Sequence, residues 1–552
     1  METYIIEERT YKMIDELQGL CQQVGISNQA AEEEVVTTVF LYKFLNDKFM
    51  HNMKKFADEV GVSVDDVIAN KDDLMDAFYL YNAKDVAFAY EDTIQCLANM
   101  VGQDDFYKRF DEVLVRIANY PKNSAYAITS DEETRIPLFT PISDKIPRSK
   151  TANFAKTIFA IITKDKFNFE DAFDCGFDFY AAVFEYMVKN YNVASGAYAE
   201  YYTPQQICKI ISIILAAIIG KKQAIEIYDC CAGTGSLVLN MANQMGKTAG
   251  MNNAVIYTQD VSVKSVRLMR LNMILNGYQE SLGNIAIDDT FENPMHFAVR
   301  EDPSSGLKKF QCIVINPPFN VDFSSSRDRI DQKWADTGRF FAGIPNVPNK
   351  DKGKMPIYLL AIQHAMYSMA DDGVAAIVVP TGFLTAKNSI AMEIRKKMIE
   401  EKMLFGVISM PSQFFANTGT NVSILFLKKQ SKYESAILVD ASKLGEKVSV
   451  GKNKRTVLRE NEILQITDTF IDCKEIEDFS VLVPFEAIKE KNYSFSAGQY
   501  FEVKIEYVDI TAEEFHQRMD EYTANLSKLF RKGKELEESI MKQMGGLERA
   551  ED

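Results

Sequence analysis

The chain has 552 residues, 47% of them hydrophobic and 25% charged, which is the composition of an ordinary globular protein with room for several domains. Its formal net charge of −16 argues against a protein that grips nucleic acid unaided, because phosphate binding is driven by lysine and arginine. The charge does not exclude a subunit that acts together with a basic partner.

Cysteine, histidine and hydropathy patterns narrow the class of protein further. The eight cysteines form no Cys-x-x-Cys pair and several lie in apolar runs, so we expect buried thiols in a reducing cytoplasm. The four histidines lie far apart in sequence, so no metal site is expected. The acidic N-terminus shows no signal peptide, and the longest apolar run, 207–219, is too short and too interrupted to span a bilayer. We therefore expect a cytoplasmic protein without a membrane partner.

The first part of the chain, residues 1–145, is predicted to be a helical N-terminal domain. Prolines and polar residues predict a linker or wrap-around loop over Asn123–Lys150, and the helical pattern resumes over Ala152–Tyr191. Apolar residues recur at helical spacing in three segments of the domain, Ala31–Phe49, Asp72–Phe88 and Phe106–Ala118.

From about residue 194, helices and strands alternate. The expected strands are Ala224–Tyr228, Ala254–Thr258, Asn284–Ile287, Cys312–Ile315, Gly373–Val379, Leu404–Ser409 and Ser423–Lys428. The expected helices are Pro204–Gly220, Ser236–Met245, Val263–Asn276, Pro356–Met369 and Ile390–Glu400. This alternation predicts an α/β domain over 146–430, with a mostly parallel sheet covered by helices on both faces. We expect residues 431–510 to form a mixed extension and 511–552 a helical tail.

A glycine turn follows the first expected strand. It runs from Asp229 through Cys230, Cys231, Ala232, Gly233, Thr234 and Gly235 to Ser236. Gly233 and Gly235 let the backbone approach a ligand, the helix N-terminus favours a carboxylate, and Asp229 can accept a hydrogen bond from an ammonium group. The loop lacks the third glycine of a pyrophosphate loop, which favours a ligand with a ribose and no pyrophosphate. A glycine turn without a ligand is the structural alternative.

Acidic residues follow the next two strands. Asp260 stands 31 residues after Asp229, where an acid can bind both hydroxyls of a ribose. Asp288 and Asp289 follow the third strand and can accept a hydrogen bond from an adenine amino group, with a helix cap or solvated loop as an equal alternative.

A Thr-Pro pair stands at the start of the first expected helix of the α/β domain. Thr203 is expected to cap this helix, with Pro204 at its first position. Taken alone, capping explains the two residues better than ligand binding.

The most informative motif is Asn316-Pro317-Pro318-Phe319, which closes an apolar strand. The prolines stiffen the backbone and leave carbonyls free to accept hydrogen bonds. Asn316 adds a side-chain acceptor and Phe319 a flat face. Together the four residues can hold a planar amino group, with an acceptor for each N–H and a ring to stack on. An ordinary turn followed by a core phenylalanine is the alternative.

The order of these motifs resembles a known family. An S-adenosylmethionine loop at Asp229–Ser236 precedes the Asn-Pro-Pro-Phe turn, and a Tyr-Thr-Pro segment at Tyr202–Pro204 precedes both, as in amino-methylating DNA methyltransferases whose target domain comes last. Over about 150–430, the chain more closely resembles the modification subunit of type I restriction–modification systems. Further agreement lies in Arg339–Pro345, Gln363-His364-Ala365, Gly373–Leu384, Met410-Pro411, Phe414-Phe415 and Thr418–Asn421. The chain departs from the family pattern at Cys231-Ala232-Gly233, Asp260 and Met355-Pro356.

The resemblance implies a Rossmann-like methyltransferase fold and an adenine-specific DNA methyltransferase of a bacterium or archaeon. Asn316, Pro317, Pro318 and Phe319 would hold the N6 amine of an adenine turned out of the DNA. The implied partners are DNA, a sequence-reading specificity subunit and a restriction subunit, with two copies of this chain per complex. The implied cofactor is S-adenosylmethionine, held by Tyr202, Thr203, Pro204, Asp229, Ala232, Gly233, Thr234, Gly235, Ser236, Asp260 and Asp289.

The tail carries apolar residues at spacings of three, four and seven, with an interruption near Gly533, which predicts a coiled-coil stripe. The resemblance implies that this stripe docks onto the specificity subunit, and packing on its own domain is the alternative.

Other functions remain open at this point. An amide also presents a planar NH₂, so a protein glutamine or an RNA base is an alternative substrate. A non-catalytic assembly subunit and a dehydrogenase of the same fold are the remaining alternatives.

Overall fold

The computed structural model describes residues 2–26, 29–70, 72–126, 137–174, 186, 203–222, 224–250, 254–300, 302–414, 420–450, 453–501 and 511–547. The chain divides into two compact units, Met1–Tyr500 and Phe501–Asp552, and each is described by itself. Within the described ranges, no helix is long and apolar enough to cross a membrane.

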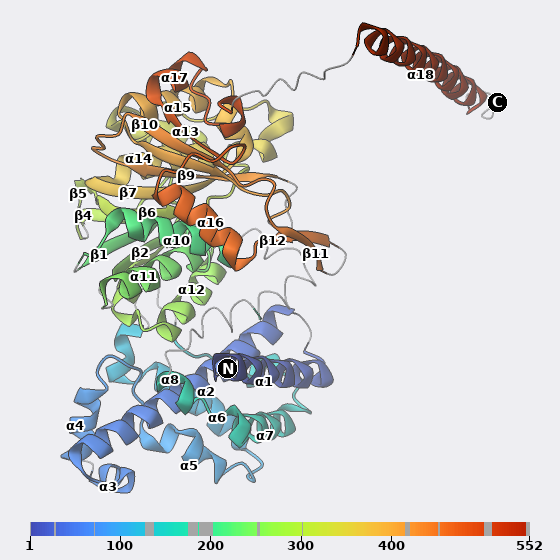
Figure 1. Cartoon of the computed structure of the whole chain (residues 1–552). Coiled ribbons are helices and arrows are strands. Elements are labelled where there is room, and N and C mark those ends of the chain that lie inside the picture. The colour runs from blue at the N-terminus through green and yellow to red at the C-terminus, as the bar shows by residue number, and fades with distance from the viewer. Residues whose placement is uncertain are drawn as a thin grey trace. The chain divides into compact units, whose positions relative to one another are not determined.

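The N-terminal part of the first unit is helical, as expected (Figure 1). Rings on its different helices pack edge to face, with centroids 4.8 Å apart for Phe106 and Phe159 and 5.2 Å apart for Phe44 and Phe173. Helices beyond residue 145 therefore share this aromatic core, and the domain limits stay predictions. The helices are α1 (Glu2–Val24), α2 (Gln29–Val60), α3 (Val64–Ala69), α4 (Leu74–Tyr81), α5 (Ile94–Ala98), α6 (Phe106–Ala118), α7 (Thr151–Ile162) and α8 (Glu170–Asp174).

The helix expected over Asp72–Phe88 is too long. Helix α4 ends at Tyr81, and the Asn82 side chain donates to the carbonyl of Val86, which turns the chain out of the helix. Phe88 is fully buried in the core, so its apolar character reflects burial and not a continued helical face.

The second part of this unit is the expected α/β structure. Nine described strands form one sheet in the order β13-β10-β8-β9-β7-β6-β1-β2-β3. Five neighbouring pairs are parallel, and β7–β9, β8–β9 and β10–β13 are antiparallel, so the expected mostly parallel sheet is confirmed. The strands are β1 (Ile225–Asp229), β2 (Ala254–Asp260), β3 (Ile285–Ile287), β6 (Phe310–Ile315), β7 (Met369–Pro380), β8 (Leu404–Ser409), β9 (Val422–Lys428), β10 (Ser435–Asp440) and β13 (Ser480–Pro484).

Burial on both faces of the sheet explains why its strands are continuous apolar runs. Cys312, Ile313, Val314 and Ile315 in β6 are all fully buried, although successive side chains point to opposite faces. The helices of this part are α10 (Gln205–Ile219), α11 (Ser236–Ala249), α12 (Val263–Leu275), α13 (Arg327–Trp334), α14 (Tyr358–Ser368), α15 (Ser389–Glu400), α16 (Glu460–Ile471) and α17 (Phe485–Glu490).

The order in which successive strands join the sheet changes direction at β1. Strands β2 and β3 lie on one side of β1, and β6 and β7 lie on its other side. The parallel register pairs Tyr228 in β1 with Ile313 in β6, so both strands end at the same edge of the sheet. The loops that follow them, Asp229–Ser236 and Asn316–Phe319, therefore leave the sheet side by side. In open α/β sheets, such a reversal is where ligands bind.

Segment 431–510 extends this sheet as well as forming other elements. Strands β10 and β13 come from it and continue the sheet beyond β8. Strands β11 (Glu446–Val450) and β12 (Asn453–Val457) form a separate antiparallel hairpin, as do β4 (Phe297–Val299) and β5 (Asp302–Leu307) from the α/β part.

The second unit contains one long helix, α18 (Ala512–Leu547), drawn as a single rod in Figure 1. The helix continues through Gly533, so the interruption expected there affects the apolar pattern and not the backbone. Its large apolar side chains are exposed, each by 46% or more: Phe515, Met519, Tyr522, Leu526, Leu529, Phe530, Leu536, Ile540 and Met541.

Candidate functional site

Asn316 leaves the carboxyl end of β6 and contacts the start of α10. Its Nδ2 donates a hydrogen bond to Oγ1 of Thr203 over 3.0 Å, although the two residues are 113 positions apart. Because the amide nitrogen is used on Thr203, Oδ1 is the part of this side chain that can accept a hydrogen bond from an amine. The amide is thereby oriented for the role expected from the sequence.

The expected helix cap at Thr203 is wrong. Helix α10 begins at Gln205, and its N-cap is Pro204, which has no side-chain acceptor. Thr203 is nearly buried and its hydroxyl serves Asn316. Tyr202, predicted to bind the cofactor beside it, lies outside the described residues.

An aromatic series supports the last residue of the motif. Phe319 is half-buried, and its ring lies 6.4 Å from that of Tyr358 at an interplanar angle of 83°. Tyr358 in turn meets Phe383 at 6.1 Å and 89°. These edge-to-face contacts fix the tilt of the Phe319 ring, which is what a stacking platform requires.

The glycine turn after β1 is held in a conformation that other residues resist. Gly233 has φ of +52° and Gly235 has φ of +83°. Three hydrogen bonds anchor the turn to the neighbouring strand and helix. Gly233 N donates to Asp260 Oδ2 at 2.8 Å, Asn272 Nδ2 donates to the carbonyl of Thr234 at 2.8 Å, and Ala232 N donates to the carbonyl of Gln259 at 3.2 Å.

Gly235 provides a test of this turn. We expect Gly235→Ala to weaken cofactor binding about tenfold, because positive φ costs a side chain roughly 1–2 kcal/mol and the new Cβ would lie 3.0 Å from Met269 Cγ. Gly250→Ala is the matched control, since Gly250 ends the same helix with φ of +74° and nothing within 4 Å of a Cβ. Cofactor dissociation constants and thermal unfolding check both variants. Equal cofactor affinity in the two would contradict the expectation.

Asp229, the last residue of β1, is a buried carboxylate with 2% of its surface exposed. Its Oδ1 accepts a hydrogen bond from Cys231 N at 2.9 Å. Burial raises the pKa of the Asp229 carboxyl to about 8, the Cys231 amide lowers it, and the nearby charge of Asp260 raises it. A cationic ligand at this position would supply the positive charge that the buried carboxylate needs.

Asp260 serves the glycine turn and retains acceptor capacity. Its Oδ2 accepts from Gly233 N and its Oδ1 accepts from Ser262 N, both at 2.8 Å. Burial raises the pKa of Asp260 and the two amides lower it. Each carboxylate oxygen can accept a second hydrogen bond, so the expected contact with ribose hydroxyls is compatible with this geometry.

Asp288 and Asp289 cap the turn that follows β3. Asp289 Oδ1 accepts from Phe291 N at 2.9 Å, and Asp288 Oδ1 accepts from Asp289 N at 2.7 Å. Burial raises the pKa of Asp289. No helix follows these residues, because β4 is the next element after β3, so the two side chains stabilise a turn and the expected helix cap is wrong. The contact between Asp289 and the cofactor stays a prediction.

Sequence reasoning missed two buried arginines that hold loops at this edge of the sheet. Arg339 and Arg395 are 0% and 1% exposed. Arg339 lies in a stretch that the family resemblance singles out, although no role could be read from it. For Arg395 the only signal was a charged residue on the apolar face of an expected helix.

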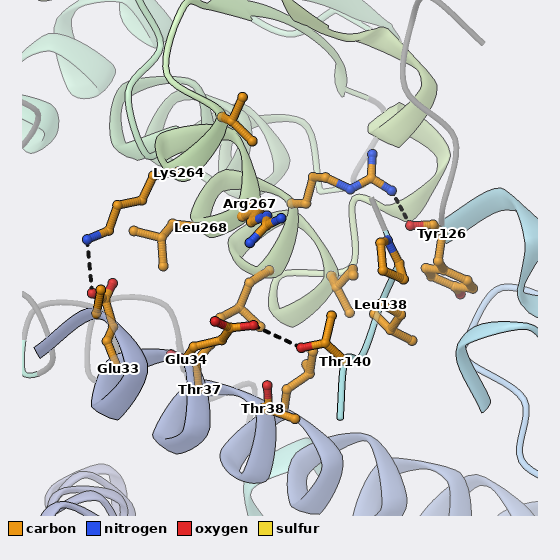
Figure 2. Close-up of a pocket in the computed structure, with 17 residues that line it drawn as sticks. Glu33, Glu34, Thr37, Thr38, Tyr126, Leu138, Thr140, Lys264, Arg267 and Leu268 are labelled. Atoms are coloured by element: carbon orange, nitrogen blue, oxygen red, sulfur yellow. Dashed lines mark hydrogen bonds and ion pairs between the residues drawn. The ribbon is translucent and has the colours of Figure 1, made fainter. Parts of the chain in front are cut away.

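A cavity of about 430 Å³ lies between α2 and α12 (Figure 2). Glu33 pairs with Lys264 at 3.2 Å, and Thr140 donates to Glu34 at 2.9 Å. None of the predicted site residues lines it, so the cavity marks the junction between the helical and α/β parts and not the candidate site.

Comparison with known proteins places the chain among methyltransferases. The model of the N-6 DNA methylase family matches residues 176–508. The type I restriction enzyme MpnII methylase subunit of Mycoplasma pneumoniae is 28% identical over 66% of this chain and 64% of its own length. The MjaIX methylase subunit of Methanocaldococcus jannaschii is 27% identical over 66% of this chain and 62% of its own length. The chain thus matches slightly less than two thirds of either relative.

A solved structure agrees in fold over nearly the whole chain. It is the type I restriction-modification system methyltransferase subunit from Streptococcus thermophilus, with a TM-score of 0.68 and 22% identity. The match covers 91% of this chain and 100% of the other. At this identity the likeness shows a shared fold.

Proposed function

Since this chain belongs to the N-6 DNA methylase family, we propose that it transfers a methyl group from S-adenosylmethionine to N6 of adenine in DNA. In this proposal it acts as the modification subunit of a type I restriction–modification complex, with a specificity subunit, a restriction subunit and two copies of itself. The observation that carries the proposal is the hydrogen bond from Asn316 to Thr203, which leaves Asn316 Oδ1 available for an amine.

The residues around the glycine turn fit the proposed cofactor. S-adenosylmethionine is a cation with an ammonium group, a carboxylate and a ribose, and it supplies an activated methyl group. Asp229 offers a buried carboxylate to the ammonium, Asp260 offers acceptors to the ribose, and the N-terminus of α11 suits the carboxylate. Asp289 is proposed to accept from the adenine amino group.

The chain's own part in the chemistry is positioning. Asn316 Oδ1 and the Pro317 carbonyl accept hydrogen bonds from the two amine hydrogens, which favours a pyramidal nitrogen and exposes its lone pair. Phe319 stacks on the extruded base and offsets the unstacking cost of a few kcal/mol. Pro318 stiffens the turn between them. A strong base is not needed before the attack, because the sulfonium would be an activated methyl donor that leaves as a neutral thioether when its S–C bond breaks. The methylated amine would then lose its extra proton to water.

One stretch of the chain departs from the negative overall charge and supports DNA binding at this edge. Residues 443–459 carry six basic side chains and one acidic one, a local charge of +5 in a chain of −16. The hairpin β11–β12 lies in it, and Thr456 donates to the carbonyl of Ser412, just after β8, at 2.6 Å. Leu458 exchanges two hydrogen bonds with Gln206, in the first turn of α10. Phosphates of DNA at the site would meet these positive charges.

The exposed stripe of α18 is the proposed docking surface for the specificity subunit. We expect Leu526→Asp with Leu529→Asp to abolish copurification with that subunit, because two charges would be buried in an apolar seam. The matched control is Asn525→Asp with Ser527→Asp, which adds the same charge to the same turn. Pull-down and cofactor titration check both variants, and cofactor affinity should not change. Retained copurification in the Leu526 and Leu529 variant would place the docking surface elsewhere.

The function itself is tested with labelled S-adenosylmethionine and purified complex, with and without the specificity subunit. We expect label in DNA only when the specificity subunit is present, and only on adenine N6 after digestion to nucleosides. Label in protein glutamine or RNA would support the alternative substrates and overturn the proposal. Binding of a nicotinamide cofactor, measured by titration, would favour a dehydrogenase.

A further inference from the structure

We infer that two buried arginines are positioning residues for opposite halves of the site, Arg339 for the cofactor half and Arg395 for the target half. The inference rests on the proposed function, which assigns Asp289 to the cofactor and Phe319 to the target base. Both guanidinium groups hold loops through backbone carbonyls at the carboxyl edge of the sheet.

Arg339 clamps the loop that carries Asp289. Its Nη2 donates to the carbonyl of Thr290 at 2.6 Å and its Nη1 to the carbonyl of Phe291 at 3.0 Å. The guanidinium lies 4.5 Å from the ring centroid of Trp334 and 4.6 Å from that of Phe340. The guanidinium binds both carbonyls in its own plane and itself lies against the rings of Trp334 and Phe340. The loop beside Asp289 therefore has little freedom to move.

The clamp continues to β1 through a histidine. Arg339 Nε donates to His364 Nδ1 at 3.1 Å, and His364 Nε2 lies 3.1 Å from the Tyr228 hydroxyl. Burial lowers the pKa of His364 well below its usual range, and the charge of Arg339 lowers it further. A neutral ring that accepts at Nδ1 carries its proton on Nε2, so it donates to Tyr228, the neighbour of Asp229. Arg339 therefore links two of the loops proposed to hold the cofactor.

The burial of Arg339 argues for a role beyond packing. Burial lowers the pKa of its guanidinium to about 10, so the group remains charged at neutral pH. Its hydrogen-bond acceptors described above are two carbonyls and an imidazole, and none of them carries a charge. An apolar side chain of similar volume would cost the fold less desolvation. Such a side chain could not connect the carbonyls of residues 290 and 291 to β1 through hydrogen bonds.

Arg395 makes the same type of clamp on the other half. Its Nη1 donates to the carbonyl of Phe383 at 2.5 Å and its Nη2 to the carbonyl of Ala386 at 2.6 Å, both after β7. Its Nε donates to the carbonyl of Tyr493 at 2.8 Å. Phe383 meets Tyr358 edge to face, and Tyr358 meets Phe319. Arg395 thus reaches the proposed base platform through a series of rings.

The two arginines are matched controls for each other. Arg339→Lys and Arg395→Lys both keep the charge and lose the planar set of donors. We expect Arg339→Lys to weaken binding of S-adenosylmethionine about tenfold or more, with little change in the KM for DNA. We expect Arg395→Lys to raise the KM for DNA or lower kcat about tenfold, with cofactor affinity unchanged.

Cofactor affinity is measured by calorimetry on the full chain, and the kinetic constants on the complex with its specificity subunit. If a lysine variant fails to fold, two milder variants carry the same test. Trp334→Phe removes the indole N–H that donates to the Glu292 carbonyl at 3.2 Å, in the loop held by Arg339. Tyr358→Leu breaks the series of rings between Phe383 and Phe319.

A separation of the two effects supports the inference. Equal losses of cofactor affinity and DNA methylation in both variants would overturn it, because a merely structural role predicts no separation. No change in either quantity would overturn it as well. The calorimetric measurement does not depend on methyl transfer, so failure of the proposed function and failure of this inference are distinguishable.

Discussion

Asn316→Ala is expected to reduce methyl transfer to DNA by about 10²–10³-fold while S-adenosylmethionine still binds with the wild-type affinity. The substitution removes the oxygen that accepts from the amine and the nitrogen that donates to Thr203 over 3.0 Å. The residue is half-buried at the end of β6, and the glycine turn, Asp260 and Asp289 lie in other loops, so the fold and these cofactor contacts should be unaffected. Single-turnover methylation and cofactor calorimetry measure the two quantities.

Thr203 provides the control for the orientation of the amide. Thr203→Val removes the hydroxyl acceptor and should lower the methylation rate by a smaller factor, about tenfold, because Asn316 can then rotate its amide. Thr203→Ser keeps the hydroxyl and should restore the rate. Methylation that survives in Asn316→Ala would support a non-catalytic assembly subunit. A serine variant as impaired as the valine variant would mean that the hydroxyl does not act through Asn316.

The affinity for S-adenosylmethionine is expected to rise about tenfold for each pH unit from 6 towards 8, and then to fall as the ammonium group of the ligand loses its own proton. Burial raises the pKa of the free Asp229 carboxyl to about 8, against a usual value near 4. A bound ammonium group favours the charged carboxylate and lowers that pKa, so binding below pH 8 must release a proton. The affinity therefore rises with pH, since protons compete with the cationic ligand for the same carboxylate.

Two controls isolate this effect. Asp229→Asn should abolish the slope and weaken binding at pH 8 by roughly 10–100-fold, the worth of a charged hydrogen bond. For the wild-type protein, 5′-methylthioadenosine should bind without the slope, because it lacks the ammonium group. Calorimetry in buffers of different ionisation enthalpy would measure the released proton. Flat affinity between pH 6 and 8 would show that Asp229 does not receive the ammonium group.

The sequence predicted the α/β part well because its strands are buried on both faces. Runs such as 312–315 and 404–409 contain little but apolar residues, and such runs bounded by turns read as strands without tertiary information. The family resemblance was also correct, since the N-6 DNA methylase model covers residues 176–508. The motifs that carried it follow the parallel strands β1 and β6, so their position at one edge of the sheet follows from the topology.

The errors and omissions come from contacts that are distant in sequence. Thr203 has the signature of a helix cap, and only the fold brings Asn316 from 113 positions away to its hydroxyl. Phe88 was included in a predicted helix because an apolar residue that is buried in a loop fits helical spacing as well as one on a helix does. Arg339 and Arg395 donate hydrogen bonds to backbone carbonyls 9–98 positions away. Every residue has a backbone carbonyl, so the sequence does not show which ones are bound. The site could therefore be located from the sequence, while the network that positions it could not.

The central claim is that this chain methylates adenine N6 in DNA. The most direct measurement is methylation-sensitive sequencing of host DNA from cells with the gene intact, deleted, and restored as the Asn316→Ala variant. The account predicts N6-methyladenine at one recognition sequence in the intact strain, its loss on deletion, and no recovery with the variant. An unchanged adenine methylation pattern after deletion, or full recovery with the variant, would contradict it.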